Sequence, residues 1–154
     1  MPLAPHIPAA LRVPAAVSVV ALAVAGMFAA EAGAKEVPVA VPSGKPVSLV
    51  ETIWPGAEAE PGARILRLRF LAPWIAASSS GEPGGIGIDV AEIDMEFLCN
   101  AVALPALASA GREADQIVIS LMAAPVDFGE AAPEVTQFFD AYRVEEGKCV
   151  WEGL

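Results

Sequence analysis

Residues 89–107 constrain the fold most, because they form the longest helical pattern that follows the N-terminal region. Apolar residues recur there at steps of three and four, so they share one face of a helix. We expect this face to pack on the rest of the domain, with Glu92, Glu96 and Asn100 toward water. The apolar residues are Val90, Ile93, Phe97, Ala101 and Leu104, with Met95, Leu98 and Val102 widening the face.

Both ends of this helix carry signals. Asp89 and Glu92 have the spacing of a capping box, which predicts Asp89 as the N-cap. Pro105 lacks a backbone donor and clashes with the preceding turn, so the regular helix is expected to stop or kink near Ala103 or Leu104.

Asp94 is the one acidic residue inside the apolar sector. A buried carboxylate needs a partner. Arg67, Arg69 and Arg143 are the candidates for a buried ion pair with it. A structural pair is the favoured hypothesis, and a catalytic role for Asp94 is the alternative.

Residues 1–34 read as a signal peptide. His6 and Arg12 make a weakly basic start, residues 13–30 are uncharged and rich in alanine and valine, and residues 32–34 supply a small-x-small cleavage site. An uncleaved anchor is the rival reading. No cysteine lies near the cut, which excludes a lipoprotein. No second apolar run is long enough to cross a membrane, so we expect an exported, periplasmic protein without a stable membrane span after cleavage.

Cleavage would remove His6, the only histidine. A chain without histidine has no Ser-His-Asp or Cys-His catalysis and no histidine-ligated metal, so we expect no metal and no cofactor. The formal net charge is −10, and residues 1–34 contain one basic and one acidic residue, so cleavage leaves it unchanged. This acidity argues against binding nucleic acid.

Cys99 and Cys149 are the only cysteines. In an oxidising compartment an intramolecular disulfide is the default, and it would join the helix to the last strand. A redox or metal pair is the alternative, although no C-x-x-C motif is present. Cys99 lies at the margin of the predicted apolar face, so the last strand should pass alongside the helix.

The rest of the chain predicts a single α+β domain over residues 46–154, preceded by an extended lead-in at 35–45. We expect a mainly antiparallel sheet of four to five strands packed on one principal helix, with one disulfide. Residues 134–141 are ambiguous between helix and strand. The predicted strands are residues 47–54, 64–71 and 116–122, followed by a hairpin of 141–144 and 148–151 that turns at 145–147.

Large apolar and aromatic residues offer a possible binding surface made of Trp54, Trp74, Ile75 and Tyr142. Core packing is the favoured role for Trp74 and Ile75. The sequence GGIGID at residues 84–89 lacks the full spacing of a dinucleotide-binding turn and does not directly follow a strand, so it does not predict a nucleotide site.

Three blocks, residues 67–75, 89–105 and 116–153, resemble a family of small exported proteins of Gram-negative bacteria that is labelled only as a domain of unknown function. The resemblance implies that both cysteines and the terminal tryptophan block belong to the family pattern, and it brings no catalytic residues. Some members carry an acetolactate synthase name. This chain is too short for a thiamine-diphosphate enzyme and has no matching cofactor motif, so it gives that name no support.

Three functions follow as hypotheses. The first is a non-enzymatic periplasmic domain that binds a protein or another envelope component, through exposed aromatics or an open sheet edge. The second is a hydrolase that uses carboxylates alone, with Asp94 and either Asp140 or Glu145 as the acid pair. The third is a thiol-redox protein that uses Cys99 and Cys149.

Overall fold

The computed structural model describes residues 36–79 and 87–153. The predicted signal peptide and His6 lie outside the described residues. The chain divides into two compact units, residues 1–31 and 32–154, and all described residues belong to the second.

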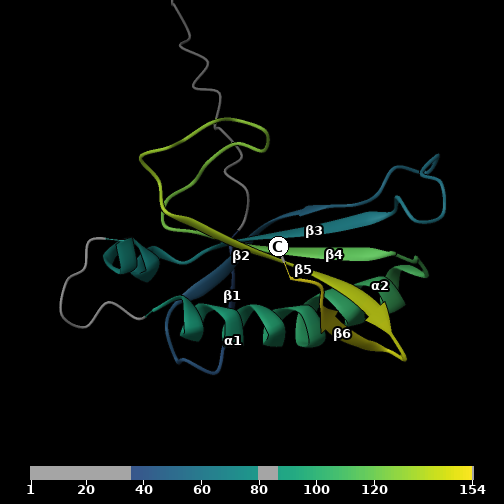
Figure 1. The fold of residues 1–154 in the computed structure, drawn as a ribbon, viewed down its shortest axis with the longest axis horizontal. Coiled ribbons are helices and arrows are strands. Elements are labelled where there is room, and N and C mark those ends of the chain that lie inside the picture. Colours follow the sequence, from purple (N-terminus) through teal and green to yellow (C-terminus); the bar gives the residue numbers. More distant parts are fainter. Residues whose placement is uncertain (1–35, 80–86, 154) are drawn as a thin grey trace, which may run out of the picture. The chain divides into compact units, whose positions relative to one another are not determined.

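A six-stranded sheet runs through this unit in the order β1-β2-β3-β4-β5-β6, which is also the order of the strands along the chain (Figure 1). All neighbouring strands are antiparallel except β3 and β4, which are parallel. The strands are β1 (Val37–Val39), β2 (Val47–Ile53), β3 (Ile65–Leu71), β4 (Gln116–Met122), β5 (Gln137–Glu145) and β6 (Lys148–Trp151).

The single parallel pair requires a crossover, because the end of β3 and the start of β4 lie at opposite ends of these two neighbouring strands. The helical segments provide it, and Figure 1 shows α1 lying along one face of the sheet. They are the 3₁₀ helix η1 (Pro73–Ser79), the α-helix α1 (Ile88–Leu98), the π-helical turn η2 (Cys99–Ala103) and the α-helix α2 (Leu104–Ala110).

The predicted fold class is confirmed: a mostly antiparallel sheet packs on one principal helix, and the fold is α+β. The sheet has one strand more than expected, because Val37–Val39 of the lead-in pairs with β2. The ambiguous segment 134–141 contributes to β5. The predicted hairpin turns at Glu146 and Gly147, whose φ values of 49° and 74° suit the left-handed turn that joins two twisted strands.

The predicted start of the helix needs correction, and the predicted end holds in part: the regular α-helix is interrupted at Cys99–Ala103, just before Pro105, but helical structure does not stop there. The N-cap is Gly87 and has no side-chain cap, and Asp89 lies in the first turn, where its charge suits the helix dipole. The helix also continues through Pro105 to Ala110. In η2 the Leu104 N–H donates to the Cys99 carbonyl, five residues back, and this wider turn places Pro105 in the first turn of α2, where a missing donor is tolerated.

The buried face of the helix is displaced by about one residue from the predicted one. Ile93 and Phe97, expected in the core, are 57% and 38% exposed. One residue of helix rotates a side chain by about 100°, so the displacement brings Cys99 from the margin of the predicted face into the core, and Asp94 is buried as expected. The buried helical residues are Ala91, Asp94, Met95, Leu98, Cys99, Ala103 and Leu107.

The two faces of the sheet differ in chemistry because alternate residues of a strand point to opposite sides. Leu66, Leu68 and Phe70 of β3 are fully or almost fully buried, with the apolar residues of β4 that pair with them, Ile117, Ile119 and Leu121. Arg67 and Arg69 alternate with these leucines. Figure 1 shows the loop of residues 123–136 on the side of the sheet away from α1.

The disulfide between Cys99 and Cys149 joins η2 to β6, as predicted. A polar contact lies next to it: the Cys149 N–H donates to Oδ1 of Asn100 at 3.1 Å. Cys99 has no exposed surface. The last strand is therefore held to the middle of the helical crossover through a side chain in the core, not through one at the margin of the helix.

A network of charged groups joins the starts of the two parallel strands. Arg64 donates from Nε and Nη2 to the carboxylate of Asp115 at 3.0 and 2.8 Å, and from Nη1 to Glu113 at 2.6 Å. The backbone N–H groups of Gly62 and Arg64 also donate to Asp115. These donors hold the pKa of Asp115 well below its usual range, with the Arg64 side chain as the largest cause.

Residues 88–110 are long and apolar enough to cross a membrane by length and composition alone. This corrects the expectation that no second apolar run reaches such a length. It is weak support for a membrane span, since the core helix of a soluble protein passes the same test. Asp89, Glu92, Asp94 and Glu96 all lie in this stretch, and charged residues inside a bilayer are costly.

We predict that replacing both cysteines by alanine lowers the free energy of unfolding by about 3–4 kcal/mol, because the bond closes a loop across a sequence separation of 50 residues. Urea denaturation of the oxidised protein and of the double variant measures this difference. A double variant as stable as the parent would contradict a stabilising role for the bond.

A second prediction concerns acid stability. The folded pKa of Asp115 lies below that of the unfolded chain, so its stabilising effect is present above about pH 4 and is lost as the pH falls further toward the folded pKa. The Asp115→Asn variant should be less stable than the parent at pH 7, and the difference should shrink in acid. Urea melts at several pH values test this, and a difference independent of pH would contradict it.

Candidate binding site

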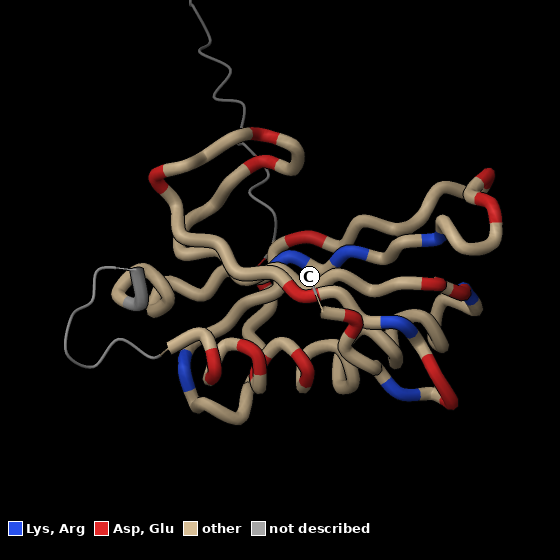
Figure 2. Tube along the Cα trace, viewed as in Figure 1, with Lys and Arg blue, Asp and Glu red and all other residues tan. Residues whose placement is uncertain are grey.

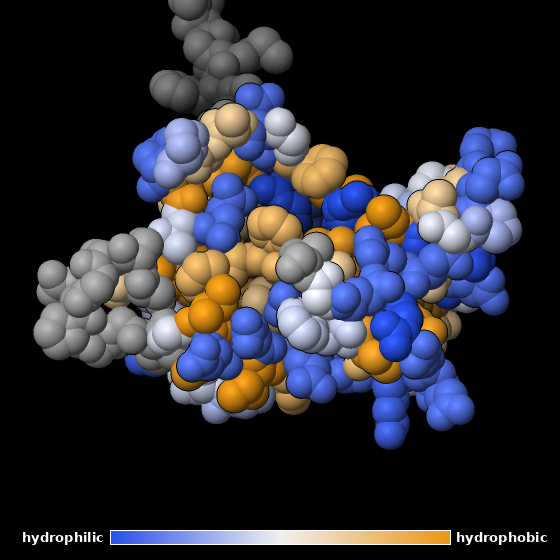
Figure 3. Space-filling model, viewed as in Figure 1, coloured by the Kyte–Doolittle hydropathy of each residue, from blue (hydrophilic) through white to orange (hydrophobic). Residues whose placement is uncertain are grey.

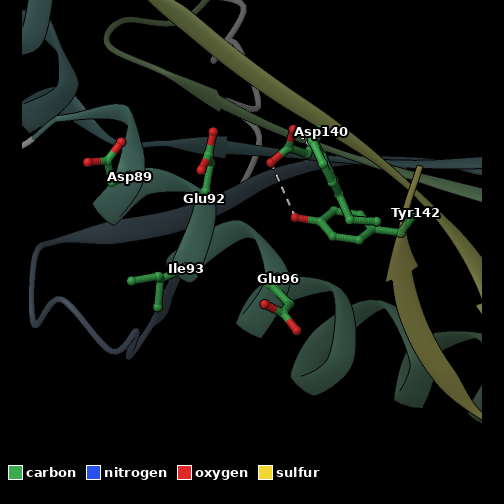
Figure 4. Close-up of a pocket in the computed structure, with 7 residues that line it drawn as sticks. Asp89, Glu92, Ile93, Glu96, Asp140 and Tyr142 are labelled. Atoms are coloured by element: carbon green, nitrogen blue, oxygen red, sulfur yellow. Dashed lines mark hydrogen bonds between the residues drawn. The ribbon is translucent and has the colours of Figure 1, made fainter. Parts of the chain in front are cut away.

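An open pocket of about 270 Å³ lies between the first turns of α1 and the C-terminal hairpin. We call it the acidic pocket. Figure 4 shows the helical side chains on one side of it and the side chains of β5 on the other. Its lining residues are Asp89, Glu92, Ile93 and Glu96 from α1, Asp140 and Tyr142 from β5, and Trp151 from β6.

Local geometry places these side chains together. Residues three and four apart lie on one face of a helix, which aligns Asp89, Glu92 and Glu96. Residues two apart in a strand point to the same side of a sheet, which aligns Asp140 with Tyr142. The register between β5 and β6 pairs Tyr142 with Trp151.

Asp140 forms the floor of the acidic pocket and is only 8% exposed. Its Oδ1 accepts a hydrogen bond from the Trp151 indole N–H at 3.1 Å. Its Oδ2 accepts a longer one from the Tyr142 hydroxyl at 3.4 Å, which Figure 4 shows as a dashed line. These two aromatic donors satisfy a carboxylate that would otherwise be costly to bury.

The potential in the acidic pocket is negative. Four of the seven described residues that line it carry a carboxylate, and none of the seven is lysine or arginine. The pKa of Tyr142 is raised above its usual range, first by burial and then by the charge of Asp140. Tyr142 therefore keeps its proton at neutral pH and stays a donor to Asp140.

Exposed apolar groups complete the site. Ile93 and Trp151 are 57% and 58% exposed, although both line the acidic pocket. Figure 3 shows orange apolar residues scattered among blue hydrophilic ones along α1. A cationic group with an alkyl stem, such as a lysine or arginine side chain, matches this combination because it can place its charge at the carboxylates and its stem on the apolar groups.

The structure does not arrange the described residues as a metal site, since no group of three or more possible ligands lies close enough together to hold an ion.

The aromatic surface predicted from sequence is divided between the core and this pocket. Ile75 has no exposed surface and belongs to the core, as favoured. Tyr142 is 1% exposed, yet its hydroxyl reaches the acidic pocket. Trp54 and Trp74 are partly buried and pack against the core, and the Arg112 guanidinium lies 4.9 Å from the centre of the Trp54 ring. The four residues do not form one exposed patch.

Sequence reasoning did not single out Glu92, Glu96 or Trp151 for binding. The helical spacing of the acids was visible, and it was interpreted only as a solvated face. The pairing of that face with β5 and β6 depends on how the helix rotates on the sheet, and no local pattern encodes this rotation.

Asp94 has a different partner from the one expected. It is fully buried, and it accepts hydrogen bonds from the Ser43 N–H at 2.9 Å and from the Ser43 hydroxyl at 2.5 Å. Ser43 belongs to the turn between β1 and β2, where Gly44 has a φ of 68°. Two neutral donors, one of them a backbone group, satisfy the carboxylate without an arginine.

The three arginines proposed for Asp94 are used elsewhere. Arg69 forms an ion pair with Glu51 and donates to the Val126 carbonyl at 2.6 Å. Arg143 pairs with Glu145 at 2.6 Å. The Arg67 guanidinium lies 5.7 Å from the centre of the Phe128 ring.

The acid pairs suggested for hydrolysis are also separated by their contacts. Asp94 is directed to Ser43 and does not line the acidic pocket, whereas Asp140 does. Glu145 is exposed and paired with Arg143. The pairing of Asp94 with Asp140 or Glu145 therefore gains no support.

Comparison with known proteins found one family. The model of a family of unknown function (DUF6497) matches residues 19–154, which confirms the resemblance to an uncharacterised family. Searches of curated proteins and of solved structures found no match.

We predict that Asp94→Ala lowers the free energy of unfolding by about 1–3 kcal/mol, because it leaves the Ser43 donors without their buried acceptor. Asp94→Asn keeps an acceptor for the Ser43 N–H and should lose less. Glu96→Ala, on the exposed side of the same helix, is the control and should change stability by less than about 0.5 kcal/mol. Thermal melts of the three variants rank them, and equal stability of Asp94→Ala and Glu96→Ala would contradict the role of Asp94.

Proposed function

The chain belongs to the family of unknown function DUF6497, and we propose that it is an exported, non-enzymatic binding domain. Its acidic pocket would receive a basic side chain of a protein or another envelope component. The pocket itself carries the proposal: four carboxylates and two exposed apolar groups meet in one hollow, and none of the described residues that line it is lysine or arginine.

The charge of the chain supports a basic partner. The net charge is −10, and Figure 2 shows several red acidic positions along α1. Opposite charge speeds encounter and excludes anionic competitors. Because the acids at Glu92 and Glu96 are exposed, the affinity of each contact should be modest and should fall with salt.

The disulfide supports the part of the proposal that places the protein in an oxidising compartment. Cys99 is fully buried and bonded to Cys149, which suits a protein that folds in an oxidising environment. The same burial argues against thiol-redox work, because a redox-active sulfur must be reached by its partner.

A hydrolase that uses carboxylates alone is the second candidate. Glu92 and Asp140 line the same pocket, one from α1 and the other from β5 (Figure 4). Such an enzyme needs two acids that flank a scissile bond. Asp140 is already engaged by the Trp151 indole and the Tyr142 hydroxyl, and this favours a structural and binding role for it.

Titration of the intrinsic tryptophan fluorescence with a tetralysine peptide tests the binding proposal, because Trp151 lies in the acidic pocket. We expect saturable binding at low salt and about tenfold weaker binding by the Glu92→Gln/Glu96→Gln double variant, which corresponds to about 1.4 kcal/mol. Acetylation of the lysine side chains should abolish binding.

The control is Glu58→Gln/Glu60→Gln, which removes the same charge from the exposed loop between β2 and β3. It should bind as the parent does. An equal loss in both double variants would mean that net charge, and not the acidic pocket, attracts the peptide. Turnover of the peptide or of a glycoside by the parent, lost in Asp140→Asn, would favour the hydrolase.

A further inference from the structure

A second pocket lies on the face of the sheet opposite α1, under the loop of residues 123–136. We call it the mixed-charge pocket. Figure 2 shows blue arginine positions along β3 and red acidic positions in the loop between β4 and β5. It holds about 250 Å³, and the residues used below are Arg67, Ser120, Asp127, Phe128, Glu130 and Phe139.

Arg67 is the central feature of the mixed-charge pocket. It projects from the middle of β3, where it is paired in register with Val118. Within the described part of the chain its guanidinium lies over the Phe128 ring, and it forms neither a hydrogen bond nor an ion pair. Its neighbour Arg69 contacts the same ring and is neutralised by Glu51. Five donors on a half-buried cation are thus left for a ligand.

A carboxylate is the group that fits these donors best, since the guanidinium fork matches its two oxygens. Ser120 lies two residues beyond Val118 in β4, pairs in register with Arg69, and lines the same pocket. Its hydroxyl adds a neutral donor to the pocket that Arg67 also lines.

Two carboxylates bring the opposite sign to the loop side of the mixed-charge pocket. Asp127 and Glu130 are exposed, line the pocket, and neither forms an ion pair within the described residues. They disfavour a purely anionic ligand, as Arg67 disfavours a purely cationic one. A ligand that carries both charges satisfies the two sides together.

The walls between these charges are apolar. Phe128 and Phe139 are 56% and 58% exposed although they lie beside a cavity. Exposed aromatic rings beside a hollow are typical of a contact surface for an apolar group. The volume limits the ligand to a small molecule.

We propose that the mixed-charge pocket binds a zwitterionic α-amino acid with an apolar side chain. The carboxylate of the ligand pairs with Arg67 and the Ser120 hydroxyl, and its ammonium group faces Asp127 and Glu130. Its side chain lies against Phe128 and Phe139. This site is on the other side of the sheet from the acidic pocket and shares no lining residue with it. A negative result for one pocket would therefore leave the proposal for the other unaffected.

Isothermal titration of the purified protein with L-phenylalanine and L-leucine tests this assignment. Binding should be saturable for both. It should be lost with the amide of each amino acid, which lacks the carboxylate, and with the N-acetyl derivative, which lacks the ammonium group. The Arg67→Gln variant should bind about 10- to 100-fold more weakly, the range expected when a charged hydrogen-bonded pair is removed.

Arg143→Gln is the matched control, because Arg143 is paired with Glu145 and does not line the mixed-charge pocket. It should bind as the parent does. Circular dichroism should show that Arg67→Gln is folded, since the Arg67 guanidinium makes only a ring contact among the described residues.

Three results would overturn the proposal. The first is no heat of binding by the parent at millimolar amino acid, and the second is unchanged affinity in Arg67→Gln. The third is equal binding of the N-acetyl derivative, which would show that a carboxylate suffices.

Discussion

The rotation of the helix on the sheet is the constraint from which the other features follow. Two contacts fix it: the buried carboxylate of Asp94 holds the turn before β2 through Ser43, and Cys99 holds β6 through its disulfide. These contacts come from adjacent turns of one helix. They attach it to the turn between the first two strands of the sheet and to its last strand. A rotation by one residue that buried Ile93 and Phe97 would take Asp94 away from Ser43 and would move Cys99 into the partly exposed position of Asn100.

That rotation creates the acidic pocket. Once Asp94 and Met95 face the sheet, Glu92 and Glu96 lie beside the hairpin of β5 and β6. The register between β5 and β6 lets Trp151 donate to Asp140, and both residues line the hollow that the helix closes on its other side. The parallel pairing of β3 with β4 requires a crossover, and the helix of that crossover lies on one face of the sheet. On the other face the loop of residues 123–136 lies over Arg67 and Arg69 of β3, and the mixed-charge pocket forms between them.

The candidate site was only partly predictable. The two cysteines could be paired from their number and an oxidising compartment, and the structure confirms the bond. Asp94 was recognisable as a buried carboxylate, but its partner was not, because Ser43 is 51 residues away and carries no charge to suggest it. Trp151 and Asp140 come from two strands whose register, not their sequence pattern, brings them together.

The sequence by itself determined the class of the fold, because period-two and period-3.6 patterns separate strands from helix and the turn residues divide them. It also determined that β5 and β6 form a hairpin, since Glu146-Gly147 can take the required positive φ values. Only the tertiary structure decided which side of the helix is buried and that β1 joins the sheet. A hydrophobic pattern predicts the buried face of a helix from the polarity of each residue alone. The cost of burying an acid, in contrast, depends on whether a segment distant in sequence supplies hydrogen-bond donors.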